Sequence, residues 1–158
     1  RFRVLKFRSM VCDAERAGAL QATANDPRTT RVGRVLRGTA MDELPQLWNV
    51  LCGDMSLVGP RPERPVFVRK FRSEVPGYML RHKVRAGLTG WAQVKYSYGA
   101  TVADALEKLQ YDVYYLLRQS IALDVRIMAR TAGVVLRASG VSHDGHATMP
   151  ELPAAQRS

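Results

Sequence analysis

The chain has 158 residues, of which 46% are hydrophobic, and this fits one domain with a buried core of its own. Its 24 lysines and arginines outnumber 14 acidic residues, so the net charge is +10, and arginine makes up most of the basic residues. Because arginine binds phosphate and carboxylate oxygens two at a time, this composition favours nucleic acid, anionic lipid head groups or a phosphorylated small molecule as partner.

The sequence excludes a zinc or dithiol redox motif and a membrane-spanning helix. Cys12 and Cys52 are far apart, and neither has the CxxC or CxH neighbours of such motifs. Two thiols in an arginine-rich domain favour a reducing, cytoplasmic setting. No apolar run reaches the roughly 18 residues that a spanning helix needs. Because the sequence starts without Met, we interpret it as part of a longer protein.

The N-terminal third predicts a strand, a loop and a helix. Alternating apolar residues predict a strand over residues 2–9. Residues 13–29 are small, polar and contain proline, which indicates a loop. The stretch TRVGRVLR, residues 30–37, has its apolar side chains at helical spacing and predicts a helix.

A short amphipathic helix is expected next, because four large apolar residues recur at the spacing of one helix face. They are Leu44, Leu47, Trp48 and Leu51. Pro45 can sit only in the first turn of such a helix, and Gly53 ends it. The helix therefore begins near residues 41–44, with Asp42 and Glu43 at its N-terminal end.

The middle of the chain predicts less regular structure. Residues 55–65, MSLVGPRPERP, form a strand stub and a rigid turn, and residues 65–76 are expected to be helical. Residues 81–99 hold three glycines and several aromatic residues, which is typical of loops and strands.

Two long helices are expected near the C-terminus. The first covers residues 101–118, with Thr101 or Asp104 as its cap, and the second covers residues 121–137. From residue 139 onward the sequence is rich in Gly, His, Pro and polar residues, which indicates a mobile tail.

These elements predict an α+β fold, mainly helical, with a small antiparallel sheet. One domain is expected over residues 1–138, followed by the C-terminal tail over residues 139–158.

Asp42 and Glu43 form a pair of adjacent carboxylates with a possible catalytic role. The free N–H groups and dipole of a helix N-terminus favour anions, which lowers the pKa of a carboxylate and keeps it ionised. Neighbouring helical residues diverge by about 100°, so one carboxylate could attack or hold a metal while the other takes a proton. On this pattern alone, ordinary acidic residues in a first helical turn are the commoner explanation.

Arg61 lies between two prolines in the sequence GPRP. Pro60 and Pro62 each fix φ, and Pro62 pushes Arg61 toward extended backbone. A stiff backbone lowers the entropic cost of presenting the guanidinium to a phosphate. A purely structural arginine, capping a helix or pairing with a buried acid, explains this local pattern equally well.

Four stretches of the sequence resemble the bacterial sugar transferase family, whose members are monotopic phosphoglycosyl transferases. They are residues 6–10 (KFRSM), 30–63, 81–94 (RHKVRAGLTGWAQV) and 109–128. The resemblance covers roughly residues 2–137, and its motifs are long and occur in the family's order. The stretch VKYSYGATVADALEKLQYD looks like the large members that start exopolysaccharide synthesis, often with glucose or galactose.

The resemblance implies transfer of a sugar 1-phosphate from a UDP-sugar to undecaprenyl phosphate, with release of UMP. Asp42 matches the family's proposed nucleophile, which forms a covalent phosphosugar intermediate, and Glu43 matches its partner. Arg61 matches the arginine of the family's GPRP motif, which is expected on a phosphate. The family uses Mg²⁺, and Asp42 is the expected ligand.

Three further basic residues match family motifs and are expected to bind substrate phosphate. Lys6 belongs to the KFRSM motif, and Arg37 precedes the carboxylate pair. Arg85 lies in VRAG, where the family usually has VRPG, so Ala86 removes one φ constraint beside it.

The resemblance also implies a place at the cytoplasmic face of the bacterial inner membrane, with a membrane-inserting helix upstream of KFRSM. Within the chain, Arg126, Arg130 and Arg137 make a basic stripe along the second C-terminal helix. This stripe could lie on an anionic membrane surface, or it could be a solvated edge of a packed helix. The sequence leaves the sugar and a homo-oligomer open.

Two other functions compete with the transferase. The charge and the interleaved aromatic residues Trp91, Tyr96 and Tyr98 suit a nucleic-acid-binding module, and the same rings could stack on uracil or pack in a core. An acidic pair among the basic residues argues against nucleic acid as a partner. A catalytically silent regulatory domain would not need Asp42, Glu43 and Arg61 together.

Overall fold

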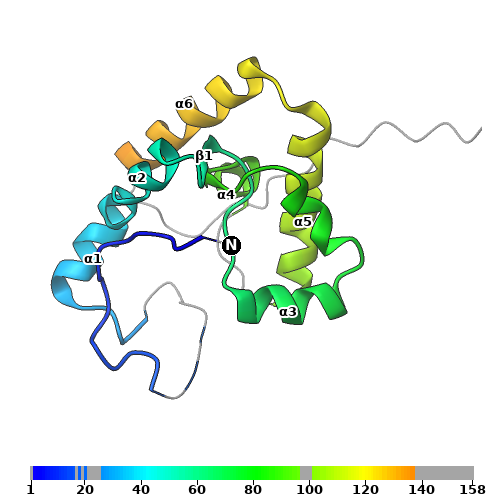
Figure 1. The fold of residues 1–158 in the computed structure, drawn as a ribbon. Helices are drawn as coiled ribbons and strands as arrows, with labels where there is room; N and C mark the ends of the chain where they lie inside the picture. The colour runs from blue at the N-terminus through cyan, green and yellow to red at the C-terminus, as the bar shows by residue number, and fades with distance from the viewer. Residues whose placement is uncertain (1, 17, 19, 21–25, 97–100, 138–158) are drawn as a thin grey trace, which may run out of the picture.

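A computed structural model describes residues 2–16, 18, 20, 26–96 and 101–137, and Figure 1 shows its fold. The elements in chain order are α1 (Arg31–Gly38), the 3-10 helix η1 (Met41–Glu43), α2 (Gln46–Leu51), β1 (Ser56–Val58), α3 (Pro65–Glu74), the 3-10 helix η2 (Tyr78–Lys83), β2 (Gly87–Thr89), α4 (Trp91–Lys95), α5 (Val102–Arg118) and α6 (Ile121–Arg137). The fold is therefore mainly helical with a small sheet, as the sequence predicts. None of the helices in the described ranges is long and apolar enough to span a membrane.

The sheet is parallel, so the predicted antiparallel pairing is wrong. Its two strands, β1 and β2, pair with Ser56 opposite Gly87 and Val58 opposite Thr89. An antiparallel hairpin would need a short turn between the strands, whereas α3 and η2 fill the connection here. That long crossover brings the second strand back in the same direction as the first.

The core has two parts, which share α5. One part gathers around Ile127 and Tyr115, which are 0% and 1% exposed, and contains Val58, Trp91, Ala92 and Tyr111. The other consists of Phe71, Val75, Tyr78, Ala105 and Leu109. In Figure 1, α6 leaves the end of α5 and crosses above β1 and α4. The helix α5 contributes Tyr111 and Tyr115 to the first part and Ala105 and Leu109 to the second, and so connects them.

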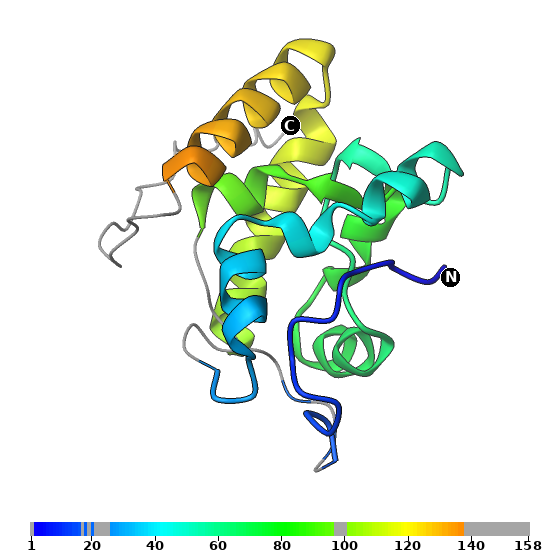
Figure 2. The same cartoon turned by 90° about the vertical axis from the view of Figure 1, so that its left-hand side faces the viewer.

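The predicted strand at residues 2–9 is extended, but it is not part of the sheet. It runs beside η1 and α2 instead (Figure 2), where the side chain of Asn49 accepts from Leu5 N–H at 3.0 Å and donates to the Arg3 carbonyl at 2.8 Å. Phe7 N–H donates to the Asp42 carbonyl at 2.9 Å. This segment is therefore held by the side chain of Asn49 and the backbone of η1 rather than by a neighbouring strand.

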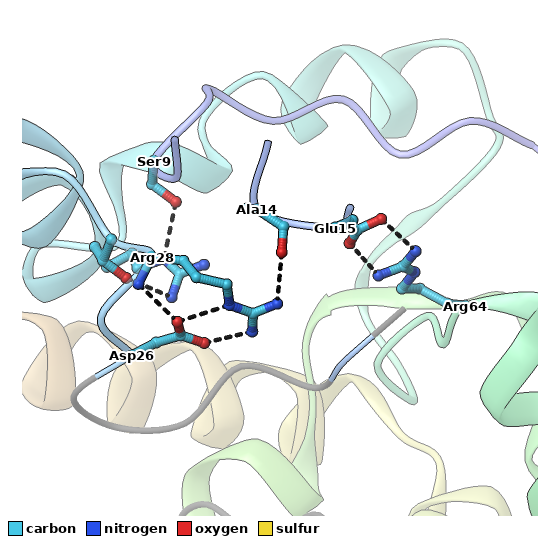
Figure 3. Close-up of polar contacts among 8 residues, drawn as sticks. Ser9, Ala14, Glu15, Asp26, Arg28 and Arg64 are labelled. Carbon is cyan, nitrogen blue, oxygen red and sulfur yellow. Dashed lines mark hydrogen bonds and ion pairs between the residues drawn. The ribbon is translucent and has the colours of Figure 1, made fainter. Parts of the chain in front are cut away.

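The predicted loop at 13–29 is closed by a single antiparallel bridge between Met10 and Thr29. Figure 3 shows two arginine–carboxylate forks beside it. Arg28 pairs with Asp26 through two nitrogens and also donates to the Ala14 carbonyl at 3.0 Å. Glu15 pairs in the same two-point manner with Arg64, the N-cap residue directly before α3. The described parts of the loop are thus attached to α3 by side chains.

The apolar face of α2 is exposed to solvent, and its polar side chains are buried. The four large residues of its apolar face are all exposed: Leu44 48%, Leu47 41%, Trp48 63% and Leu51 78%. The buried side chains are polar, with Gln46 2% and Asn49 4% exposed. An ordinary amphipathic helix packs its apolar stripe on the core. We call these four exposed residues the α2 apolar face.

The two long helices, α5 and α6, follow the sequence closely. Thr101 caps α5, and its side chain and Asp104 form a reciprocal capping box. The helix α4 was not predicted, because the residues around it were interpreted as loop and strand. The predicted C-terminal tail and Tyr98 lie outside the described residues.

Candidate active site

The carboxylate pair lies in η1, a single 3-10 turn between α1 and α2. Ala40 precedes it in left-handed conformation, at φ 54°, which is an unfavourable conformation for a residue with a Cβ. Asp42 is buried, at 8% exposed, and the side chain of Glu43 is 16% exposed. The pair therefore belongs to a tight turn ahead of α2 rather than to the first turn of that helix.

Two cations converge on Glu43. The ammonium of Lys6 lies 2.6 Å from its Oε1. The guanidinium of Arg61 donates to both of its oxygens, with NH1 at 3.3 Å from Oε2 and NH2 on Oε1. Lys6, Glu43 and Arg61 come from three separate parts of the chain, so the fold brings together three of the predicted site residues.

The backbone on either side of Lys6 determines its position. Leu5 N–H donates to the side chain of Asn49, and Phe7 N–H donates to the carbonyl of Asp42. Lys6 is thus held between two backbone hydrogen bonds to the η1–α2 segment. Its side chain reaches Glu43 from a segment that has no strand partner.

The segment before Arg61 is held by close backbone packing against β2. Gly59 N–H donates to the Thr89 carbonyl, and Gly87 N–H donates to the Pro60 carbonyl, both at 2.9 Å. A Cβ on Gly87 would lie 2.1 Å from the backbone nitrogen of Gly59, and a Cβ on Gly90 would lie 2.2 Å from its oxygen. Only glycine allows this crossing, and the crossing places Arg61 beside the carboxylates.

The pKa values of the two carboxylates are shifted in opposite directions. Burial raises the pKa of Asp42, and the neighbouring Glu43 adds to the shift, while Lys6 and Arg37 oppose it. Burial also acts on Glu43, but Arg61 and Lys6 outweigh it and hold the pKa of Glu43 below its ordinary value. The predicted lowering of the Asp42 pKa by a helix N-terminus is therefore wrong, because the residue is buried in a turn.

The other predicted phosphate-binding residues occupy different surroundings. Arg37 donates from Nε to the Ser9 hydroxyl at 2.8 Å, and its charge acts on Asp42. Arg85 lines an open groove between α2, β1 and α6, which Asp124 also lines. The structure thus places Arg37 near the carboxylate pair and Arg85 in a different hollow of the surface.

Asp42 and Glu43 are the carboxylates of this site that could hold the predicted Mg²⁺. No group of three or more His, Cys, Asp or Glu side chains at metal-binding distance occurs within the residues described. Mg²⁺ keeps several waters and is held by one or two carboxylates together with substrate phosphates. A site with two carboxylates fits that ion, and Asp42 is the better candidate because Glu43 already pairs with two cations.

Four polar residues near the site were not predicted to be site residues. Gln46 and Asn49 are buried, although the amphipathic pattern of α2 places them on its polar side. Arg81 and Asp112 form a buried ion pair, with Arg81 Nε 3.0 Å from Asp112 Oδ2. A signal for Asp112 does exist, because it lies among the apolar residues of α5.

Comparisons with known proteins identify the family of the chain. Residues 1–138 match the model of the family described as bacterial sugar transferase. The chain is 50% identical over 139 residues to a UDP-N-acetylgalactosamine-undecaprenyl-phosphate N-acetylgalactosaminephosphotransferase of Aeromonas hydrophila, an alignment that covers 88% of this chain and 33% of that protein.

Two further relatives extend the comparison. A UDP-glucose:undecaprenyl-phosphate glucose-1-phosphate transferase of Escherichia coli K12 is 47% identical over 133 residues, covering 82% of this chain and 28% of the relative. An exopolysaccharide production protein PSS of Rhizobium leguminosarum is 44% identical over 138 residues, covering 82% and 68%. The chain thus spans only about a third of the first two relatives.

Proposed function

Because the chain belongs to the bacterial sugar transferase family, we propose that it carries the catalytic domain of a polyprenyl-phosphate phosphoglycosyl transferase. The reaction is transfer of a hexose 1-phosphate from a UDP-sugar to undecaprenyl phosphate, with release of UMP. It would start exopolysaccharide or glycoconjugate synthesis at the cytoplasmic face of the bacterial inner membrane. Relatives named for N-acetylgalactosamine and for glucose support the reaction class and leave the sugar open.

The observation that carries this proposal is the convergence of Lys6 and Arg61 on Glu43, next to the buried Asp42. A carboxylate that attacks a diphosphate must overcome repulsion between like charges. Two cations beside the attacking group offset that repulsion, and the rigid backbone of Arg61 keeps its fork in place. Their present partner is also anionic, so a phosphate can replace or share the contact.

In the first half-reaction, Asp42 is the nucleophile. One of its carboxylate oxygens forms a bond to the phosphorus that carries the sugar, and the bond from that phosphorus to the bridging oxygen breaks, releasing UMP. In the second half-reaction, an oxygen of undecaprenyl phosphate attacks the same phosphorus and Asp42 leaves. Glu43 accepts the proton of the lipid phosphate or orients it.

Mg²⁺ bound at Asp42 would supply charge neutralisation for the diphosphate oxygens. The chain's own contribution is the placement of cations around that position. Lys6 and Arg61 lie on one side of the carboxylate pair, and Arg37 acts on Asp42 from α1.

The α2 apolar face supports an orientation toward an anionic membrane. It follows the carboxylate pair directly in sequence, and nothing in the described core covers it. Inserted at the level of the lipid head groups, it would place the pair near the phosphate of a polyprenyl substrate. The basic residues would then interact with anionic lipid head groups.

The test is release of UMP by the full-length protein in membranes, with undecaprenyl phosphate and a panel of UDP-sugars. We expect UMP from at least one UDP-hexose and none with Asp42→Asn. Arg64→Lys is the matched control, because Arg64 makes the same two-point contact with a carboxylate away from this site. Equal UMP release by wild type and Asp42→Asn would overturn the proposal.

A further inference from the structure

We propose that Arg81 and Asp112 are positioning residues that set the backbone of the GPRP segment and therefore act on the reaction through Arg61. This inference rests on the proposed function, because it assigns a role within the same site. Both residues lie in stretches that resemble the family, residues 81–94 and 109–128, but the resemblance assigns a role to neither. Both come from elements outside the carboxylate pair, Arg81 from η2 and Asp112 from α5.

Arg81 uses its three guanidinium nitrogens for three different contacts. Nε lies 3.0 Å from Asp112 Oδ2, NH1 donates to the Tyr78 hydroxyl at 2.8 Å, and NH2 donates to the Arg61 carbonyl at 2.9 Å. The side chain is buried, at 8% exposed. A planar fork can make such contacts together, whereas the single ammonium of a lysine cannot.

The hydrogen bond from Arg81 to the Arg61 carbonyl fixes ψ of Arg61, the one backbone torsion of this segment that the two prolines do not fix directly. The rings of Pro60 and Pro62 fix φ on both sides of Arg61, and the Pro60 carbonyl is held by Gly87 N–H at 2.9 Å. The direction of the Arg61 carbonyl is determined by ψ of Arg61 itself. Pro62 restricts that torsion to the extended region, and Arg81 selects one direction within it.

Asp112 holds Arg81 in place at a cost to folding. It is 2% exposed, and burial raises its pKa to about 6 even though Arg81 lies beside it. Burying an ionised carboxylate lowers the stability of the folded protein, so a gain in stability does not explain why Asp112 occupies this position. A role in orienting Arg81 gives a reason for its presence, since the apolar residues that could replace it would leave the guanidinium unpaired.

The experiment is a double-mutant cycle on the full-length protein in membranes, measured as the rate of UMP release. Arg81→Lys keeps the charge and loses the fork, and we expect about a tenfold loss of activity, roughly the effect of one lost hydrogen bond to a charged group. In an Arg61→Ala background, Arg81→Lys should not lower the rate of UMP release any further. A residue that only maintains the fold would lower activity by the same factor in both backgrounds.

Arg28→Lys is the matched control, because Arg28 makes a comparable fork with the buried Asp26 but has no contact with Arg61. It should lower thermal stability and leave the rate per folded enzyme unchanged. If Arg81→Lys does not accumulate, Asp112→Asn provides the same cycle, since it keeps the shape of the side chain and removes the charge.

Three outcomes separate the inference from the proposed function. If Arg61→Ala lowers UMP release and Arg81→Lys multiplies that loss, the positioning role is wrong and the transferase is retained. If Arg61→Ala leaves UMP release unchanged, the positioning role is overturned and the transferase is again retained, whereas a wild-type protein that releases no UMP from any UDP-sugar would overturn the proposed function itself.

Discussion

The guanidinium of Arg61 donates hydrogen bonds to both carboxylate oxygens of Glu43. Together with Lys6, it compensates the charge of Glu43 and holds its pKa low, while burial raises the pKa of the adjacent Asp42. The two carboxylates therefore have different electrostatic environments although they are neighbours in sequence. Groups whose pKa values are pushed apart can take different roles in one reaction, and the function proposed above assigns them different roles.

The two-point contact of Arg61 predicts a large effect of a conservative change. Arg61→Lys keeps the charge but loses one of two hydrogen bonds to the phosphate, and we expect UMP release to fall by roughly 10- to 100-fold. The measurement is steady-state UMP formation in membranes. Arg64→Lys, which loses an exposed fork with Glu15, should stay within about twofold. If UMP release falls by a similar factor in both variants, Arg61 has no specific role in the reaction.

A covalent intermediate predicts a burst of UMP before lipid is added. With UDP-sugar alone, quenched-flow mass spectrometry should detect about one UMP per active site and a phosphosugar on the peptide that contains Asp42. Asp42→Asn should abolish both signals, and Glu43→Gln should retain some labelling if Glu43 acts mainly in the second half-reaction. Normal turnover with both substrates but neither burst nor adduct would show direct displacement instead.

Removal of divalent cations should abolish UMP release, because two carboxylates and two cations do not neutralise a diphosphate with its attacking anion. We expect excess EDTA to stop the reaction and Mg²⁺ to restore it. Ca²⁺ should restore it poorly, since it prefers more ligands and longer bonds. Full activity in EDTA would contradict the assignment of Asp42 as a metal ligand.

We expect the α2 apolar face to contact the membrane and to contribute little to the stability of the core. Trp48→Gln should weaken binding to anionic vesicles by roughly tenfold and leave the free energy of unfolding nearly unchanged. The fluorescence of Trp48 should shift to shorter wavelength on vesicle addition. Val66→Gln is the control, because Val66 is an exposed apolar residue of α3, and α3 lies away from α2 in Figure 1. Unchanged vesicle binding by Trp48→Gln would refute the orientation.

Asp112 predicts a pH dependence of stability. Its pKa is raised from 3.8 to about 6, so between these values only the folded protein keeps the proton. Its contribution to the free energy of unfolding therefore falls as pH rises from about 4 to about 6, by about 3 kcal/mol, and is constant above. Arg81, Glu63 and Lys108 are the charged groups that act on it.

The check is urea unfolding of wild type and Asp112→Asn from pH 4 to pH 7. The stability difference between the two proteins should change within this window and level off above it. If the free energies of unfolding of the two proteins differ by the same amount at every pH, the pKa of Asp112 is not raised by folding.

Periodicity and motif spacing were enough to predict α1, α3, α5 and α6, because these helices have clear caps or apolar spacing. The same reasoning failed for the sheet, since a three-residue strand does not encode the direction of its partner. It also missed α4, whose residues Trp91–Lys95 follow a glycine and were interpreted as loop. Short elements are determined by tertiary contacts more than by local sequence.

Glu43, Arg61 and Lys6 were singled out mainly because their motifs resemble those of the family, and the structure brings the three side chains into contact. Asp42 shows the limit, because its pKa depends on burial that no local pattern reveals. Arg81 was missed for a similar reason, since its contacts reach a carbonyl 20 residues away and a carboxylate on another helix. A polar residue on an apolar face, such as Asp112, is the signal that was available.

The backbone crossing of Gly59, Gly87 and Gly90 has a genetic consequence. A methyl group at any of the three would lie within 2.4 Å of a backbone atom of the opposing chain, so even alanine would displace the segment that carries Arg61. Random mutagenesis should therefore recover null alleles at these glycines as often as at the charged residues, although none of the three has a side chain that could take part in chemistry. Suppressors within the same gene should be rare, because no second substitution makes room between two backbones.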